Sequence, residues 1–550
     1  MAFSRPGVYI TEGPFTTNAS IGPQVTPAAF FGTVARGPIG PTRIDSWNQY
    51  KALYGDLTNT SDLGYSVYQF FANGGRSAYI NRIAHTTTAQ NNAAAVTAKS
   101  GSITGTIGAS SSVVTLFKVQ AKSPGTWANW VASSTTTTEL GLKVVLTPGQ
   151  RDGIPETVNV GGGVFGKGAP RTFNLFVYFN GVEVERWTEV SLDPDSAQYI
   201  LNIVNTYSIY ADVVEVDAGL TAGVDYTLTG LTYGNPSSGS ATYKIGDATA
   251  SGDVEGTNGT VVDADWTTAV DALDTVPGAL LINLVGQTSK SLVDKATTYA
   301  ETRGNAFVII DPSKTLLTSA AITGLTDTYN KSSYGAVYYP VLKMPDPARS
   351  GSATLRDTFP GGAIAGLFSR VEQERTVAKA PAGYAYDIRN AYALTTNFTE
   401  ASIGLLYDSN VNTMKNIPGG GIIINGARTL KRTDITKYVP VRRSLNYIKH
   451  NVETIANYAL FEPNGERVWT DINNRVWKFL ADFWGAGGLK GRNVTEAFYI
   501  ICDSTNNTTY TIENGELHVE VGVALQSPAE FIVINVSQFA GSSNTTAETI

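Results

Sequence analysis

Cysteine and histidine are scarce in this 550-residue sequence. It holds one cysteine, Cys502, and three histidines, His85, His450 and His518. A single thiol cannot close an internal disulfide, so a small disulfide-stapled scaffold is excluded and a reducing compartment is expected. The scattered histidines form no Cys/His cluster with the spacing of a conventional zinc site, and we interpret His450 and His518 as structural residues. The sequence predicts no metal and no cofactor.

The motifs of common enzyme classes are also absent, since neither G-x-S-x-G nor H-E-x-x-H occurs. The stretch GGGVFGKG at 161–168 is close to a phosphate-binding loop, but Gly168 stands where that loop needs a hydroxyl. Asp311 ends an apolar strand, where α/β enzymes often place acidic residues, yet no partner motif accompanies it. We therefore predict no catalytic residues, and an α/β enzyme that acts through Asp311 remains the alternative from a different class.

Positive charge and long apolar runs are lacking as well. The formal net charge of −7 argues against a nucleic-acid partner. No apolar run approaches the roughly 18 residues of a membrane-spanning helix, and MAFSRPGVYITEG has no signal-peptide core. We expect a soluble protein made in the cytoplasm, with no nucleic-acid partner and no membrane insertion.

What the sequence has is apolar mass in regular patterns. Apolar residues make up 42% of the chain, enough for several cores. Helical spacing marks SWNQYKALYG and LGYSVYQFFANGG, and SAYINRIA reads as a strand. From Gly278 onward strands (ALLINL, AFVIID, YGAVYYP) alternate with helices (SKSLVDKATTYAETRG, GGAIAGLFSRVEQE), which predicts a parallel sheet with helical crossovers.

Between Thr86 and Asp265 the composition changes. Threonine, serine and glycine dominate, and apolar and polar residues alternate in runs such as SVVTLFKV and TFNLFVYF. FNG at 179–181 lies between two such runs and predicts a hairpin turn. We interpret this block as an all-β insertion.

The last third carries two amphipathic helices and a local excess of positive charge. One apolar stripe comprises Val441, Leu445, Ile448, Val452, Ile455 and Ala459; the next comprises Trp469, Ile472, Val476, Leu480 and Phe483. We interpret Trp469, Trp477 and Trp484 as packing residues. Residues 427–492 hold twelve Lys/Arg against six Asp/Glu. Two interpretations stay open: the charges solvate the polar faces of the helices, or they meet an acidic partner surface.

Each end of the chain carries a short apolar strand on a Gly/Pro- or Ser-rich lead. In AEFIVINVSQF, Ile532, Ile534 and Val536 point to one side of a strand, and Phe531 and Val533 point to the other. A strand that is apolar on both faces must be covered on both faces, and as a free edge it invites aggregation. Such a segment is suited to strand addition across subunits.

The sequence segments quoted above, taken together, resemble one protein family. RPGVYITEG followed by VTPAAFFGTVARGPIGPTRIDSWNQYKALYGD is similar to the N-terminal signature of contractile-tail sheath proteins of bacteriophages. RTDITKYVPVRRSLNYIKHNVETIANYALFEPNGERVWTDINNRVWKFLADFWGAGGLKG and the closing strands resemble its C-terminal region. The resemblance covers roughly residues 5–85 and 278–541.

The resemblance implies a structural subunit of a contractile tail sheath. Such subunits polymerise as stacked hexameric rings around a tail tube, contact baseplate and tail terminator proteins, and contract to drive the tube through the host envelope for genome delivery. The expected location is the virion, after assembly in the host cytoplasm. The implied fold is α/β and α+β multidomain, with a subtilisin-like α/β central domain without a catalytic triad, a β-rich outward-facing insertion, and an α+β C-terminal domain that faces the tube. The expected divisions are an N-terminal arm at 1–25, core at 26–89, insertion at 90–265, core at 266–400, C-terminal domain at 401–527 and C-terminal arm at 528–550.

The same resemblance assigns the candidate assembly residues. Strand exchange between subunits is expected at Val8, Tyr9, Ile10, Thr11, Phe531, Ile532, Val533, Ile534 and Val536. The basic residues expected to face the tube are Arg442, Arg443, Lys449, Arg467, Arg475 and Lys478. Two further readings remain: the sheath of a bacteriocin or injection system, and an added adhesin role for the segment 90–262.

Overall fold

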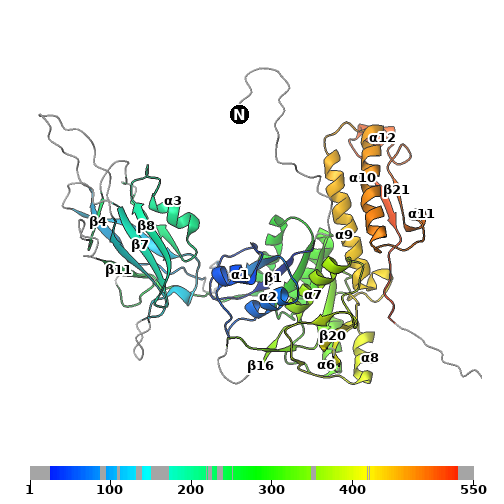
Figure 1. Ribbon diagram of the computed structural model, residues 1–550, viewed down its shortest axis with the longest axis horizontal. Coiled ribbons are helices and arrows are strands. Elements are labelled where there is room, and N and C mark those ends of the chain that lie inside the picture. The colour runs from blue at the N-terminus through cyan, green and yellow to red at the C-terminus, as the bar shows by residue number, and fades with distance from the viewer. Residues whose placement is uncertain are drawn as a thin grey trace, which may run out of the picture.

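A computed structural model describes most of the chain as three bodies joined in a row (Figure 1). The described residues are 25–86, 95–107, 112–131, 139–149, 172–217, 220, 226–231, 240–250, 252–348, 355–417, 419 and 421–530. A β-rich body lies at one end, a central α/β body in the middle, and a helical body with a small sheet at the other end. No helix in these ranges is long and apolar enough to cross a membrane.

The central body is built on a nine-stranded sheet with the order β17-β20-β19-β14-β13-β12-β1-β3-β2. The six strands from β19 to β3 in this order pair in parallel, and β2, β20 and β17 pair antiparallel at the edges. The bounds are β1 Ala28–Gly32, β2 Thr42–Ile44, β3 Ala78–Arg82, β12 Leu280–Leu284, β13 Ala306–Ile310, β14 Gly335–Tyr339, β17 Asp387–Ile388, β19 Val411–Ile417 and β20 Gly421–Asn425. The parallel sheet predicted from the strand–helix alternation is therefore confirmed.

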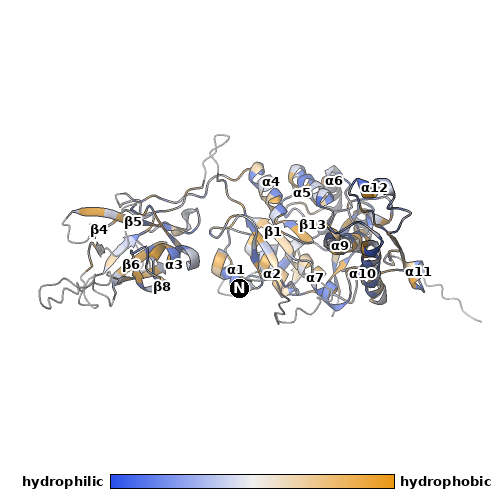
Figure 2. Cartoon of the chain, turned by 90° about the horizontal axis from the view of Figure 1, so that it is seen from above, coloured by the Kyte–Doolittle hydropathy of each residue, from blue (hydrophilic) through white to orange (hydrophobic). Residues whose placement is uncertain are grey.

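Helices cover both faces of this sheet, as Figure 2 shows for β1 and β13. On one face lie α1 (Trp47–Tyr54), α2 (Leu63–Ala72) and α7 (Gly361–Glu374); on the other lie α4 (Asp263–Asp271), α5 (Lys290–Arg303), α6 (Ser319–Thr328) and α8 (Glu400–Asp408). Every residue of β1, β12, β13 and β14 is buried. Strands that are apolar on both faces require this double cover. A small sheet of β15 (Leu342–Pro345), β16 (Leu355–Thr358) and β18 (Ala393–Leu394) lies beside it.

The two helices α2 and α7 pack unusually close to each other. A Cβ atom added at Gly362 would lie 1.9 Å from the carbonyl oxygen of Ser66, and one at Gly366 would lie 2.4 Å from that of Phe70. Glycine at these two positions, one helical turn apart, lets the α7 backbone rest directly on α2. The GGAIAG word of the sequence is thus a packing motif.

Gly362→Ala should destabilise the central body, because backbone atoms of Ser66 cannot yield as a flexible side chain would. The expected loss in free energy of unfolding is about 1–3 kcal/mol, measured by chemical denaturation. Gly324→Ala is the control, because it lies in helix α6 with no atom within 4 Å of the added methyl group. That control should leave stability unchanged or raise it by up to about 1 kcal/mol. Equal effects of the two substitutions would contradict the close-packing account.

The insertion folds around its own core in two four-stranded sheets, ordered β10-β4-β5-β9 and β11-β6-β7-β8. Its elements are β4 Ile103–Ile107, β5 Val113–Ala121, β6 Leu142–Pro148, β7 Thr172–Phe179, β8 Val182–Ser191, α3 Ile200–Tyr207, β9 Ala211–Val214, β10 Tyr226–Leu228 and β11 Ala241–Lys244. The FNG hairpin is confirmed, with Asn180 and Gly181 both at positive φ between β7 and β8. The stretch 161–168 lies outside the described residues.

A cationic side chain from the central body joins the insertion to it. The Arg36 guanidinium lies 4.5 Å from the ring centre of Tyr210 and 5.5 Å from that of Phe179. Nearby, Arg82 donates hydrogen bonds to carbonyl oxygens on both sides of the junction, Ala35 and Pro124. Cation–π contacts and charge-assisted hydrogen bonds therefore attach the β-rich body.

The third body contains the two predicted amphipathic helices, α9 (Val439–Ala456) and α10 (Glu466–Gly485). It also holds α11 (Val494–Ala497), α12 (Thr509–Glu513) and a two-stranded sheet of β21 (Phe498–Ile501) and β22 (Glu520–Val523). Both predicted apolar stripes contribute to one core. Among the tryptophans, Trp469 and Trp484 pack as predicted, but Trp477 is 51% exposed.

The structure moves two of the expected boundaries. Strands β19 and β20 pair into the central sheet through β14, so the C-terminal domain begins after Asn425 and not at residue 401. Residues 263–265, placed in the insertion, open helix α4, which packs on the central sheet. Both errors have the same cause: a strand or helix is assigned to a body by its long-range partners, which local composition does not record.

Candidate assembly surfaces

The residues predicted to exchange between subunits, Val8–Thr11 and Phe531–Val536, lie outside the described residues. What the structure does describe is the chain next to each of them, from residue 25 and up to residue 530. At both places a carboxylate and an arginine hold the chain on the folded body.

Near the C-terminal end, Glu530 binds Arg428. The Nε and Nη2 atoms of Arg428 donate to the two carboxylate oxygens at 3.0 and 2.8 Å. The guanidinium also lies 3.5 Å from the ring centre of Tyr407, and the Tyr438 hydroxyl is 3.4 Å from Glu530. Burial alone would raise the pKa of Glu530, but hydrogen bonds from Arg428 and Tyr407 outweigh it and lower that pKa.

Near the N-terminal end, Glu372 at the end of α7 binds Thr26. The backbone N–H and the hydroxyl of Thr26 donate to its two oxygens at 2.9 and 3.1 Å. Arg443 forms an ion pair with the same carboxylate, and both charged side chains are about 95% buried. A buried pair of this kind is stable only when its remaining hydrogen-bonding positions are filled, and Thr26 fills two of them.

Both attachments meet at the start of helix α9. Arg428 and Tyr438 form an isolated β-bridge, and the Val439 N–H donates to the Ala427 carbonyl at 2.9 Å. Tyr438 directly precedes α9, and Arg443 lies in its second turn. The start of α9 therefore contacts both attachments: Arg443 belongs to the helix, and Arg428 is bridged to the residue before it.

This arrangement corrects two of the six basic residues expected to face a tube. Arg443 is buried against Glu372, and Arg442 is buried with its Nε donating to Asn446 at 3.0 Å and its guanidinium 4.3 Å from the Tyr334 ring. They were misassigned because their position in a basic segment says nothing of which side of the helix faces the core. Lys449, Arg467, Arg475 and Lys478 are exposed, and Arg475 pairs with Asp471. Their role stays a prediction.

The small sheet of β21 and β22 covers α10 with one face only. Phe498, Ile500, Val521 and Val523 belong to the core with α10, whereas Tyr499 is 53% exposed on the other face. The Tyr499 ring crosses Gly522, where a Cβ would lie 2.0 Å from the ring, and its hydroxyl donates to Glu520 at 2.9 Å. In the described part of the chain no further strand joins this sheet; an isolated bridge links Leu489 and Leu525 beyond the end of β22.

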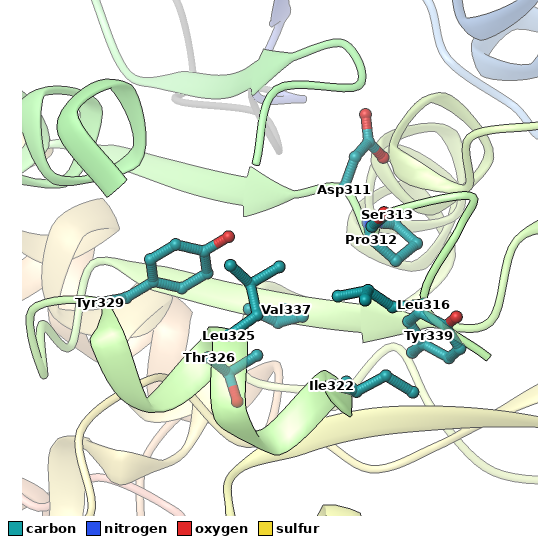
Figure 3. Close-up of a pocket in the computed structure, with 10 residues that line it drawn as sticks. All are labelled: Asp311, Pro312, Ser313, Leu316, Ile322, Leu325, Thr326, Tyr329, Val337 and Tyr339. Carbon is teal, nitrogen blue, oxygen red and sulfur yellow. The ribbon is translucent and has the colours of Figure 1, made fainter. Parts of the chain in front are cut away.

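Asp311, the alternative catalytic residue, serves a structural purpose. Its carboxylate accepts hydrogen bonds from the Gly361 N–H at 2.8 Å, the Asn283 side chain at 3.0 Å and the Gly286 N–H at 3.1 Å. It thus ties the ends of β12 and β13 to the start of α7. Figure 3 shows the carboxyl turned away from the apolar side chains that line the adjacent crevice, among them Ile322 and Val337.

The surroundings of the three histidines are those of structural residues and do not suggest catalysis. His85 is buried with Nδ1 3.0 Å from an Asp265 oxygen, and His518 is exposed beside Glu516. His450 lies half-buried on α9. Within the described ranges no group of three potential metal ligands is found.

The Asp311 carboxyl makes a pH-dependent contribution to stability. Burial raises its pKa from 3.8 to about 6. The stabilisation that the protonated carboxyl gives to the folded state is therefore complete at pH values below the unfolded-state pKa. It is lost as the pH rises through about 6. Relative to Asp311→Asn, which cannot ionise, the wild-type protein should gain about 1 kcal/mol or more in free energy of unfolding when the pH falls from about 7.5 to about 5. Asp45→Asn, at an exposed site, is the control. Parallel pH profiles of wild type and Asp311→Asn would contradict this assignment.

Comparison with known proteins gives these surfaces a context. The fold is that of a multidomain α/β scaffold with several sheets, and two family models match it in tandem. The phage tail sheath protein central domain matches residues 259–430, and the phage tail sheath C-terminal domain matches residues 431–539. Together they cover just over half of the chain. The chain belongs to the phage tail sheath family.

Two curated relatives agree with this assignment. The tail sheath protein of Vibrio phage KVP40 is 26% identical over 176 residues, which are 32% of this chain and 25% of that protein. The tail sheath protein of Enterobacteria phage T4 is 25% identical over 174 residues, 31% of this chain and 26% of that protein. The matched region thus spans about a quarter of these relatives.

Solved structures share the fold over nearly the whole chain. The sheath tail protein of Listeria innocua has a TM-score of 0.56 at 10% identity, covering 91% of this chain and 95% of that one. The sheath complex of the extracellular contractile injection system PVC, in its contracted state, has a TM-score of 0.52 at 19% identity, covering 98% of both chains. The contracted helical sheath of the anti-feeding prophage has a TM-score of 0.51 at 16% identity, covering 98% of this chain and 100% of that one.

Proposed function

We propose that this protein is the structural subunit of a contractile phage tail sheath. Subunits assemble as stacked hexameric rings around the tail tube, between baseplate and terminator proteins, and contract to drive the tube through the host envelope for genome delivery. Family membership is the observation that carries the proposal. It is supported by the ion pairs that hold the described chain at Thr26 and Glu530, and by a C-terminal sheet that has two strands in the described residues.

The terminal segments act as arms donated to neighbouring subunits. A two-stranded sheet is marginal by itself, and its edges accept added strands through backbone hydrogen bonds. The β21–β22 sheet is the acceptor: one face already packs on α10, and apolar arm strands such as Phe531–Val536 extend it and cover more of the core. Subunits linked in this way stay connected while their bodies shift, which contraction requires.

A rough energy comparison explains why both ends are needed. Burying five large side chains of Phe531–Val536 contributes roughly 7–15 kcal/mol. Ordering about eight backbone residues costs on the order of 8–16 kcal/mol. One arm is therefore weak alone, and two arms repeated around a ring bind through high effective concentration.

The orientation of the subunit follows from the same proposal. The C-terminal body faces the tube with Lys449, Arg467, Arg475 and Lys478, the subtilisin-like core serves as a scaffold without protease activity, and the β insertion faces outward. Arg467, Arg475 and Lys478 share one face of α10, opposite its buried stripe, because they recur at helical spacing. Virion location and assembly in the host cytoplasm complete the proposal.

A second candidate is the sheath of an injection system or bacteriocin. The full-length similarity to the PVC and anti-feeding prophage sheaths favours it, and its mechanics would be the same. The contents of the particle that carries the sheath distinguish the two candidates: phage particles contain a genome.

Removal of the C-terminal arm tests the assembly proposal. The purified wild-type protein should form hollow, striated cylinders in negative-stain micrographs. A chain lacking residues 531–550, and the variant Ile532→Asp/Ile534→Asp, should stay folded but form none, because a charged strand cannot fill an apolar groove. Ser542→Asp/Ser543→Asp adds the same charge beyond the strand and should assemble normally. Cylinders from the truncated chain would refute the donated strand.

Charge reversal tests the surface that faces the tube. Arg467→Glu/Lys478→Glu should weaken co-sedimentation of the protein with purified tubes by on the order of 10-fold or more at low salt, because complementary charge guides this contact. Arg43→Glu/Lys290→Glu, two exposed basic residues on the central body, provide the matched control. Equal loss in both variants would remove the α10 face from the proposed tube contact.

A further inference from the structure

Two carboxylates lie where the terminal segments join the folded body. Glu530 is the last described residue and lies at the start of the arm expected at 528–550. Glu372 holds Thr26, the residue that follows the arm expected at 1–25. We propose that the Glu530–Arg428 and Glu372–Arg443 pairs are clamps that fix the points from which the two arms leave the body. The inference rests on the proposed function and assigns these four residues as positioning residues for subunit exchange.

The C-terminal clamp fixes the orientation of the Glu530 carboxylate in addition to pairing its charge. Two parallel N–H donors reach the two oxygens of Glu530, and such a bidentate pair fixes the plane of the carboxylate. The side chains of Arg428 and Glu530 are 16% and 13% exposed, so solvent screens the pair less than a surface ion pair.

Contacts that do not involve Glu530 also hold Arg428 in place. Its N–H donates to the Asn412 side-chain oxygen at 2.7 Å, and its carbonyl accepts from the Asn412 side-chain nitrogen at 2.7 Å. Its guanidinium lies on the Tyr407 ring, and one nitrogen donates to the Tyr407 carbonyl at 3.3 Å. These contacts preorganise the arginine, so Glu530 binds a rigid site on the central body.

The N-terminal clamp uses the backbone as well. Glu372 accepts from the N–H of Thr26, which ties the main chain itself two residues before strand β1. Its partner Arg443 lies with its guanidinium 4.4 Å from the ring centre of Phe368, so both sides of this ion pair are packed. The N-terminal arm therefore starts from a fixed point on the body.

Both clamps are attached at the start of helix α9. Arg428 is bridged to Tyr438, the residue before α9, and Arg443 lies in the second turn of that helix. The same helix shares the C-terminal core with the β21–β22 sheet. Both clamps and the proposed acceptor sheet are thus linked to α9 by direct contacts. Each donated strand then meets a neighbour in one register, and subunit movement during contraction is taken up by the chain beyond the clamps.

The C-terminal clamp can be tested on the unassembled full-length chain. Ala529 is exposed, whereas Cys502 is only 1% exposed, so a fluorophore on Ala529→Cys in a Cys502→Ser background reports motion beside Glu530. Adding Glu530→Gln should increase the amplitude of fast anisotropy decay about two-fold, since the bidentate charged contact is lost. Asp45→Asn, which removes an exposed ion pair, should leave the decay unchanged.

Assembly gives the second readout, in chains without the fluorophore. Glu530→Gln should slow cylinder formation, followed by light scattering, by about 10-fold, as expected for loss of a charge-assisted contact, while the body keeps a cooperative thermal unfolding transition. The exchanged pair Arg428→Glu/Glu530→Arg should recover part of the rate. Thr26→Val, which keeps its shape but loses one hydrogen bond to Glu372, should slow assembly by a smaller factor.

Three outcomes separate this inference from the proposed function. If the wild-type chain forms no cylinders, the proposed function fails. If it forms cylinders and Glu530→Gln matches Asp45→Asn in both anisotropy and assembly rate, only the clamp is refuted. If Glu530→Gln frees the label and leaves the assembly rate unchanged, the pair is a local contact and has no positioning role.

Discussion

A strand that is apolar on both faces must be covered on both faces, and this constraint organises the whole molecule. In the central body the chain meets it internally: β1, β12, β13 and β14 are buried between two helix layers. In the C-terminal body the described residues pack on one face of the β21–β22 sheet, and Tyr499 is exposed on the other. The apolar sequence at 531–536 would need cover of the same kind, which the proposed exchange between subunits would supply.

Close backbone contacts and buried hydrogen bonds hold the layers of the central body together. Glycines at 362 and 366 bring α7 onto α2, and Asp311 ties the start of α7 to the ends of two strands. The last turn of the same helix carries Glu372, the anchor of Thr26. One helix, α7, therefore both packs in the core and holds the chain at Thr26.

Charge is used differently in the three bodies. The Arg36 guanidinium packs on aromatic rings of the insertion, while Arg428 and Arg443 form ion pairs with Glu530 and Glu372. Each of these arginines is largely buried, where desolvation makes an unpaired charge costly and a paired one directional. The basic residues of α10 are exposed instead, and Arg475 among them pairs with Asp471.

The sequence by itself determined the local elements, because hydrophobic periodicity is a local property. The helices over 47–54, 439–456 and 466–485, the strands at 280–284, 306–310 and 335–339 and the Asn180–Gly181 turn were predictable from it, and the resemblance over residues 5–85 and 278–541 indicated the family. Only the tertiary structure decided which distant residues meet. It buried Arg442 and Arg443, moved β19 and β20 into the central sheet, and paired Glu372 and Glu530 with arginines 71 and 102 positions away. Such pairings depend on topology and register, which no window of neighbouring residues contains.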